Sequence, residues 1–117
     1  MGVGLKMVEE IKGEKWLPIT KPNWSYEISP AGNIRRLGKA VRVQATGRGQ
    51  PFVNLFDPDR KKFRCYSVPR LMALTFLGPP PSPYAVARTL DGNRLNCNKE
   101  NIVWASKKNP WIVLQRP

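Results

Sequence analysis

The chain has 117 residues, with 20 Lys and Arg against 8 Asp and Glu, no His, two Cys and a net charge of +12. This length suits one or two small domains. No apolar run approaches the ~18 residues that a membrane helix needs, and the N-terminus lacks the apolar core of a signal peptide. We therefore expect a cytoplasmic protein with no membrane partner, in which Cys65 and Cys97 are reduced thiols.

The missing residue types exclude several kinds of site. Without His, the two cysteines cannot complete a four-ligand zinc site. Neither a Ser-His-Asp triad nor a Cys-His pair can form, and the commonest general base is absent. The composition therefore predicts a protein without a bound metal or cofactor.

The positive charge is concentrated in the middle of the chain. Residues 33–70 carry ten basic side chains against two acidic ones, whereas residues 1–32 carry four of each. In a chain with a pI near 10.3, such a stretch is the electrostatic signature of a nucleic-acid-binding protein. A merely soluble surface is the alternative. An anionic membrane is disfavoured because no basic amphipathic helix is visible.

In chain order, residues 1–15 are polar and are expected to form a flexible segment or a short helix. Tyr26 and Ile28 alternate with Glu27 and Ser29. This alternation predicts a strand in which the two apolar residues point inward and the two polar residues point outward. A turn at SPAGN follows. Further antiparallel strands are expected in NIRRL, KAVRVQA, PFVNLFD and KFRCYSV, the last two joined by a hairpin turn at DPDRK.

The pattern changes at Pro69, where a helix is expected to start, with Leu71, Leu74 and Leu77 at helical spacing and a stop at Gly78. A proline-rich linker at 79–83, a strand in YAVARTL, a turn at DGN and then a strand or a helix in NCNKENIVWAS complete the body. The fold class is therefore α+β. The apolar tail at 111–117 is expected to dock on the body, and the core is expected to include Trp16, Trp24 and Trp104.

Two stretches resemble a known family. EKWLPITKPNWSYEISPAGNIRRL resembles the nuclease-associated modular domain that precedes many phage HNH homing endonucleases, with matches at Trp16, Tyr26, Ile28, Ser29, Gly32, Ile34, Arg35 and Leu37. VPRLMALTFLGPPPSPYAVARTLDGNRLNCNKENIVWAS is similar to the HNH module of the same proteins. The resemblance implies an N-terminal antiparallel β region at 16–68 that contacts DNA, then a ββα-metal element at 69–110 and a tail at 111–117.

The resemblance breaks down at the family's catalytic positions. Aligned on DGN, Arg88 takes the place of a metal ligand and Thr89 that of the catalytic His. Pro69 replaces another family His, and the last ligand falls at Asn109 or Pro110. Asn101 alone matches the residue that orients the base.

Threonine is no base near neutral pH, and a permanently cationic arginine cannot ligate a metal. These replacements predict a degenerate, nuclease-dead module with no catalytic residues, which would not be an enzyme. Arg88 is expected instead to clamp a DNA phosphate. An exposed strand arginine without a ligand is the alternative for this position.

The predicted function is duplex-DNA binding by a phage-encoded regulatory or accessory protein derived from a homing endonuclease. The candidate DNA-binding residues are basic side chains of the early strands, the hairpin and the HNH-like module: Arg35, Arg36, Lys39, Arg42, Arg60, Lys61, Lys62, Arg64, Arg88 and Arg94. Three alternatives remain. They are a phage effector that binds a host polymerase, gyrase or nuclease, an active HNH-type nickase with an atypical site, and an RNA-binding protein.

Overall fold

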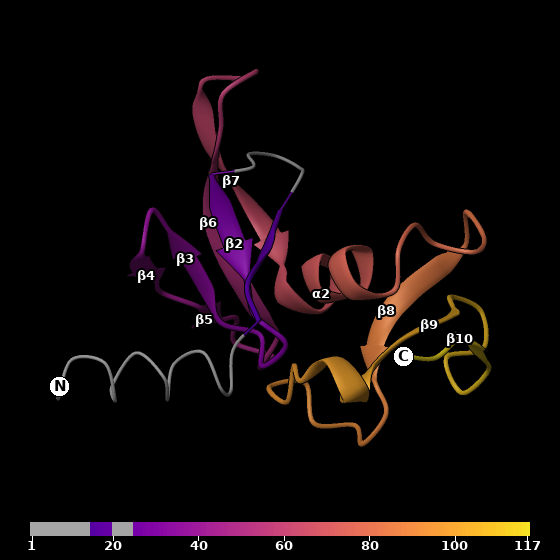
Figure 1. Ribbon diagram of the computed structural model, residues 1–117. Helices are drawn as coiled ribbons and strands as arrows, with labels where there is room; N and C mark the ends of the chain where they lie inside the picture. Colours follow the sequence, from indigo (N-terminus) through magenta and orange to yellow (C-terminus); the bar gives the residue numbers. More distant parts are fainter. Residues whose placement is uncertain (1–14, 20–24) are drawn as a thin grey trace, which may run out of the picture.

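The computed structural model describes residues 15–19 and 25–117, which form three small antiparallel sheets and one α-helix (Figure 1). Residues 1–14 of the predicted flexible or helical segment at 1–15, and also Trp24, lie outside the described residues. The mixed, strand-rich architecture agrees with the predicted α+β class. In the described part of the chain, no helix has the length and apolar character to cross a membrane.

The first sheet has the strand order β1-β2-β3-β4 and spans Leu17–Pro18, Tyr26–Ile28, Ile34–Arg36 and Lys39–Val41. Ile28 pairs with Ile34 across β2 and β3, and both side chains are buried. The prediction that Ser29 points outward is wrong, because this residue is fully buried. Its hydroxyl accepts a hydrogen bond from the Asn33 amide at 3.2 Å and so closes the turn between the two strands.

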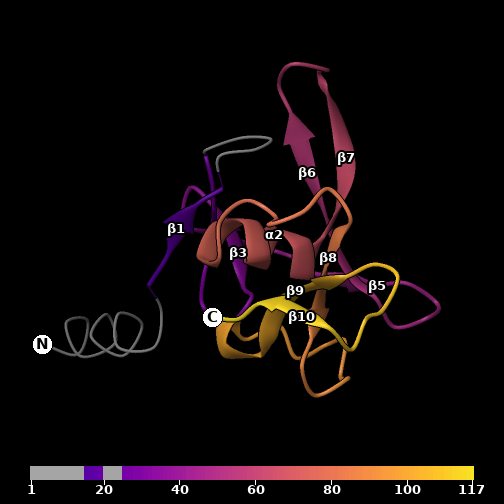
Figure 2. The same cartoon turned by 90° about the vertical axis from the view of Figure 1, so that its right-hand side faces the viewer.

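The second sheet contains β5 (Gln44–Ala45), β6 (Pro51–Asp57) and β7 (Lys62–Ser67) in that order. Along β6 every second residue is buried, as the period of a strand with one covered face requires. β7 is an edge strand and is exposed along nearly its whole length. The β6–β7 hairpin extends away from the rest of the molecule in both views (Figures 1 and 2).

The single described helix, α2 (Val68–Phe76), starts and stops where the sequence predicts. The Ser67 hydroxyl caps its first turn by accepting from the Arg70 amide at 3.4 Å, and Pro69 occupies the first turn. Gly78 follows the helix with φ at 94°, and its amide donates to the Ala73 carbonyl at 3.1 Å. This left-handed end is a common helix terminator.

The third sheet has the order β10-β9-β8, with β8 at Ala85–Thr89, β9 at Ile102–Ser106 and β10 at Val113–Gln115. A short 3₁₀ helix, η1 (Lys99–Asn101), precedes β9. The ββα element that the resemblance implies is therefore not observed, because β9 is followed within the described residues by a third strand and not by a helix. The tail docks through β10, but Trp111 is 74% exposed, against our prediction.

The core joins all three sheets to α2 and centres on Trp104, which is fully buried as predicted. The indole Nε1 of Trp104 donates to the Gly78 carbonyl at 3.2 Å. Trp16 is only half-buried. Both cysteines are free, and burial raises the pKa of Cys97 to about 11. The Cys97 thiol is therefore protonated at neutral pH.

Two contacts fix the first sheet to the segment before β9. Gly32 lies so close to Cys97 that a Cβ atom at position 32 would meet the Cys97 Cβ at 2.9 Å. The Lys99 amide donates to the Pro30 carbonyl at 2.7 Å. The β2–β3 turn is therefore seated against the loop that connects β8 to β9.

Candidate functional site

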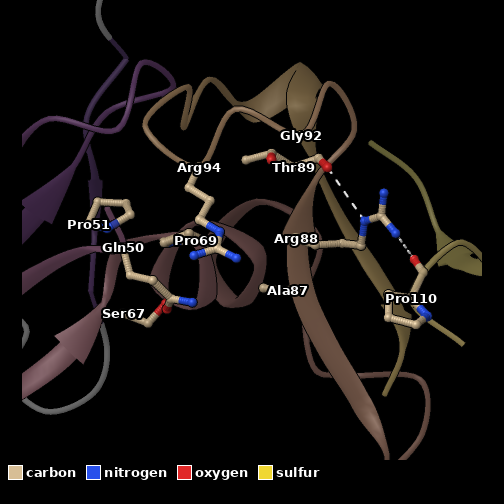
Figure 3. Close-up of a pocket in the computed structure, with 10 residues that line it drawn as sticks. All are labelled: Gln50, Pro51, Ser67, Pro69, Ala87, Arg88, Thr89, Gly92, Arg94 and Pro110. Atoms are coloured by element: carbon tan, nitrogen blue, oxygen red, sulfur yellow. Dashed lines mark hydrogen bonds between the residues drawn. The ribbon is translucent and has the colours of Figure 1, made fainter. Parts of the chain in front are cut away.

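A pocket of about 370 Å³ lies between the start of β6, the start of α2, β8 and the loop that follows β8 (Figure 3). Pro69, Arg88, Thr89 and Pro110 all line it. The resemblance aligned Arg88, Thr89 and Pro110 with metal-binding and catalytic positions of the family, and Pro69 with another family His. The fold thus brings these positions, which are far apart in the sequence, to one pocket.

The Arg88 side chain points away from the middle of the pocket and toward the loop between β9 and β10 (Figure 3). Its Nη1 donates to the Pro110 carbonyl oxygen, and its Nε lies 3.5 Å from the Thr89 carbonyl oxygen. Thr89 itself is a buried residue of β8. Arg88 therefore places a positive charge at the rim of the pocket and also holds the 107–112 loop against β8.

Figure 3 shows the Arg94 side chain pointing from the loop after β8 into the pocket. Its Nη1 donates to the Arg48 carbonyl at 3.0 Å. The side chain therefore bridges the two sides of the pocket. Its contact with position 48 is invisible in the sequence, because 46 residues separate the two partners.

Gln50 and Ser67 also line the pocket, and the sequence interpretation missed both. The sequence indicates Ser67 only as a helix cap, because a serine directly before an apolar run that contains a proline is a helix-start signal. Gln50 follows a turn and carries no recognisable signal. Both offer neutral hydrogen-bonding groups beside the two arginines.

The loop after β8 is organised by Asp91, which was not a predicted site residue. Its carboxylate accepts hydrogen bonds from the side-chain amides of Asn101 at 3.0 Å and Asn96 at 2.9 Å, and from the Asn93 backbone amide at 2.8 Å. The hydrogen bond from Asn101, followed by those from Asn96 and Asn93, lowers the pKa of Asp91. Asn101, aligned with the family's orienting residue, thus fixes this loop and does not line the pocket.

The lowered pKa of Asp91 predicts a pH-dependent stability. A carboxyl group whose pKa is lower in the folded state stabilises the fold above its unfolded pKa, near 3.8, and loses that contribution as pH falls through the folded value. We expect Asp91→Asn to destabilise the protein at pH 7, because the NH2 group that replaces one carboxylate oxygen faces the donating side-chain amide of either Asn96 or Asn101. The difference from wild type should shrink below about pH 4.

Urea denaturation of both proteins at pH 7 and pH 3 measures this effect. An equal difference in unfolding free energy at the two pH values would show that the carboxylate charge has no part in holding the loop.

The family resemblance implies a divalent metal, and the residues of this pocket do not fit one. Arg88 and Arg94 repel a cation, and the oxygen-bearing side chains of Gln50, Ser67 and Thr89 are neutral. Among residues 15–19 and 25–117, no three His, Cys, Asp or Glu side chains lie close enough together to hold a metal ion.

The predicted DNA-binding residues of the first sheet are partly engaged inside the protein. Arg35 pairs with Glu27 at 2.8 Å and lies over the Trp16 ring at 4.2 Å. The Arg36 guanidinium lies over the Tyr26 ring at 5.2 Å. Lys39 and Arg42, in contrast, are exposed. Replacing Arg35 or Arg36 would therefore change packing as well as charge, so Lys39 and Arg42 are the cleaner probes of this sheet.

The cations of the β6–β7 hairpin lie at its protruding end. The Asp57 carboxylate is mostly buried and draws in Arg60 at 3.8 Å and Arg64 at 3.9 Å. Lys61 and Lys62 are exposed, and Lys61 takes the turn's positive φ of 53°. The structure thus gathers the predicted residues into separate groups on the first sheet, on the hairpin and at the pocket.

The comparisons with known proteins point in one direction. No family model matches the chain. An uncharacterized HNH endonuclease of Acanthamoeba polyphaga mimivirus is 34% identical over 87 residues, which are 73% of this chain and 25% of that protein. A solved structure described as DNA binding and cleavage by the HNH homing endonuclease I-HmuI superposes with a TM-score of 0.70 and 27% identity. The superposition covers 80% of this chain and 53% of the solved chain.

This chain thus spans about a quarter of the mimivirus protein and about half of the solved chain. The prediction that it is not an enzyme is wrong on this evidence, because both similar proteins are named as endonucleases, which are enzymes. By sequence and by three-dimensional structure, the chain is HNH endonuclease-like.

Proposed function

We propose that this chain binds duplex DNA as an HNH endonuclease-like module and holds the DNA backbone through its exposed cations. The observation that carries the proposal is the pocket that gathers Arg88, Thr89 and Pro110, the positions aligned with the family's metal-binding and catalytic residues. Among its described lining residues it has two guanidinium groups and no carboxylate. Arginine suits this task because its planar, permanently charged group can donate two parallel hydrogen bonds to a phosphate.

The rest of the molecule supports the same partner. A net charge of +12 on 117 residues attracts a polyanion from a distance, and the similar solved structure concerns DNA binding. The hairpin is a two-stranded β-ribbon, and B-DNA's major groove is wide enough to admit one. In this arrangement phosphate contacts position the protein, and strand side chains in a groove supply any sequence preference.

The exposed end of the hairpin gives a direct test of backbone contact. We expect the double variant Lys61→Ala/Lys62→Ala to weaken duplex binding. The slope of log affinity against log salt should shrink by about 0.9 for each phosphate that the variant no longer neutralises. Lys99→Ala, which removes an exposed charge on η1, is the matched control and should leave the slope unchanged.

Fluorescence anisotropy with a labelled duplex at several salt concentrations gives both quantities. Wild-type affinity and slope in the hairpin variant would remove this hairpin from the interface.

DNA strand cleavage is a second candidate function, favoured by the two HNH endonucleases that the chain resembles. Supercoiled plasmid incubated with pure protein and Mg²⁺ or Mn²⁺, with an EDTA control, tests it. Nicked or linear plasmid that appears only with metal would establish cleavage. If the plasmid stays intact under conditions where the protein demonstrably binds it, the protein binds DNA without cleaving it.

A competition experiment tests the alternative that the protein binds RNA. Duplex DNA should displace a labelled duplex better than structured RNA does. The reverse order would favour RNA as the partner. Phage origin and a regulatory role stay predictions, as does the host-protein alternative.

A further inference from the structure

The loop between β9 and β10 presents an aromatic side chain to solvent. Trp111 is 74% exposed, the second-highest exposure among the large hydrophobic residues of the described chain. Lys107 and Lys108 precede it in the same loop, and both are exposed. An exposed tryptophan leaves a large apolar side chain in water, and burying that side chain against a partner would be favourable.

The exposure of Trp111 does not result from a loose loop. The Ser106 amide donates to the Ile112 carbonyl at 3.0 Å, and the Ile112 amide donates to the Asn109 carbonyl at 2.8 Å. The Arg88 guanidinium binds the Pro110 carbonyl oxygen from the adjacent strand. The chain is therefore fixed on both sides of Trp111, and the indole is held outward by a well-anchored turn.

The position of this turn relates Trp111 to the pocket. Pro110, its neighbour in the sequence, lines the pocket (Figure 3), and Arg88 connects the two. A DNA strand advances by about 3.4 Å per nucleotide along the helix axis. A phosphate held beside Arg88 therefore has its own nucleosides about one such step away, and Arg88 contacts the 107–112 loop at Pro110.

We propose that Trp111 stacks on a nucleobase that has left the DNA stack, next to a phosphate held in the pocket. The inference rests on the proposed DNA binding and adds a base contact to it. Stacking on an aromatic ring tolerates any base sequence, because every base has a π-face. The two lysines that precede Trp111 in its loop favour a nucleic acid over an apolar protein surface as the occupant, since their charges attract phosphates.

The test compares a fully paired duplex with the same duplex carrying a short single-stranded gap. Trp111→Ala should bind the gapped DNA roughly tenfold or more weakly than wild type does, whereas its affinity for the paired duplex should change little. The salt dependence should stay unchanged, because the indole neutralises no phosphate. Trp111→Phe should retain most of the affinity, since the phenyl ring still stacks.

Tyr84→Ala is the matched control. Tyr84 is 67% exposed and directly precedes β8. Its carbonyl oxygen accepts a hydrogen bond from the Lys107 amide at 2.9 Å, and alanine retains this backbone contact, so the replacement removes only an exposed ring and should alter neither affinity. The melting temperatures of all three variants should equal that of wild type, because both aromatic residues are exposed. The intrinsic fluorescence that wild type has and Trp111→Phe lacks should be quenched by gapped DNA.

Equal affinity of Trp111→Ala and wild type for gapped DNA, or fluorescence of Trp111 that DNA does not quench, would overturn the stacking proposal alone. Failure of the wild-type protein to bind either DNA would overturn the proposed function together with it.

Discussion

Replacing Gly32 with alanine should destabilise the fold by about 3 kcal/mol, the sum of two separate costs. Gly32 has φ at 86°, where an L-residue pays roughly 1–2 kcal/mol. The new methyl group would also meet the Cys97 Cβ at 2.9 Å and the Cys97 carbonyl oxygen at 3.1 Å. Overpacking of this kind costs about 1–3 kcal/mol. The clash would separate the β2–β3 turn from the loop before β9.

The variant Gly38→Ala measures the backbone cost without the overpacking cost. Gly38 has nearly the same φ, 81°, but an added Cβ there has no neighbouring atom within 4 Å. We expect this control to show only the backbone cost of about 1–2 kcal/mol. Urea denaturation of both variants measures the difference. Equal destabilisation at the two positions would show that the Gly32–Cys97 contact does not hold the first sheet in place.

Removing the pocket arginines should produce the largest decrease in DNA affinity. Each charged hydrogen bond to a phosphate contributes about 1.5–3 kcal/mol. Each arginine donates to one backbone carbonyl oxygen, Arg94 to that of Arg48 and Arg88 to that of Pro110. We expect Arg94→Ala to weaken duplex binding more than Arg88→Ala, because the Arg94 side chain points into the pocket whereas Arg88 points away from its middle (Figure 3). Arg88→Lys should recover only part of the affinity, since an ammonium group cannot donate two parallel hydrogen bonds.

Arg116→Ala, an exposed charge in the tail, is the control and should change affinity little. Anisotropy titrations beside melting temperatures distinguish a weakened DNA interface from a destabilised fold. Wild-type affinity in both Arg94→Ala and Arg88→Ala, with melting unchanged, would show that no phosphate occupies this pocket.

The local elements were predictable from the sequence because their signals are local. Proline and glycine bracket α2, and alternating burial along β6 is visible in the residues themselves. Ser29 breaks its strand's alternation because its hydroxyl closes a turn, which the apolar pattern does not report. Trp111 was expected to dock because an apolar side chain favours burial, but in the described part of the chain it is 74% exposed.

The pocket was predictable only in part. The family resemblance singled out Pro69, Arg88, Thr89 and Pro110, and the fold brings these residues together. Arg94 was predicted as a DNA-binding residue, but its bridge to the Arg48 carbonyl depends on how the second sheet packs against the loop after β8. Long-range packing of this kind leaves no periodic trace in the sequence. The missing helix after β9 is a further difference that the spacing of the matched residues did not indicate.

The most direct test of the proposed function is the affinity of the wild-type protein for a duplex DNA, measured from 50 to 200 mM salt. If the cations of the pocket and the hairpin hold the DNA backbone, log affinity should fall linearly with log salt, at a slope of about −0.9 for each phosphate neutralised. Neutralising roughly four or more phosphates would weaken binding on the order of a hundredfold or more over this range. No duplex binding at 50 mM salt, or an affinity that does not change with salt, would contradict the proposal.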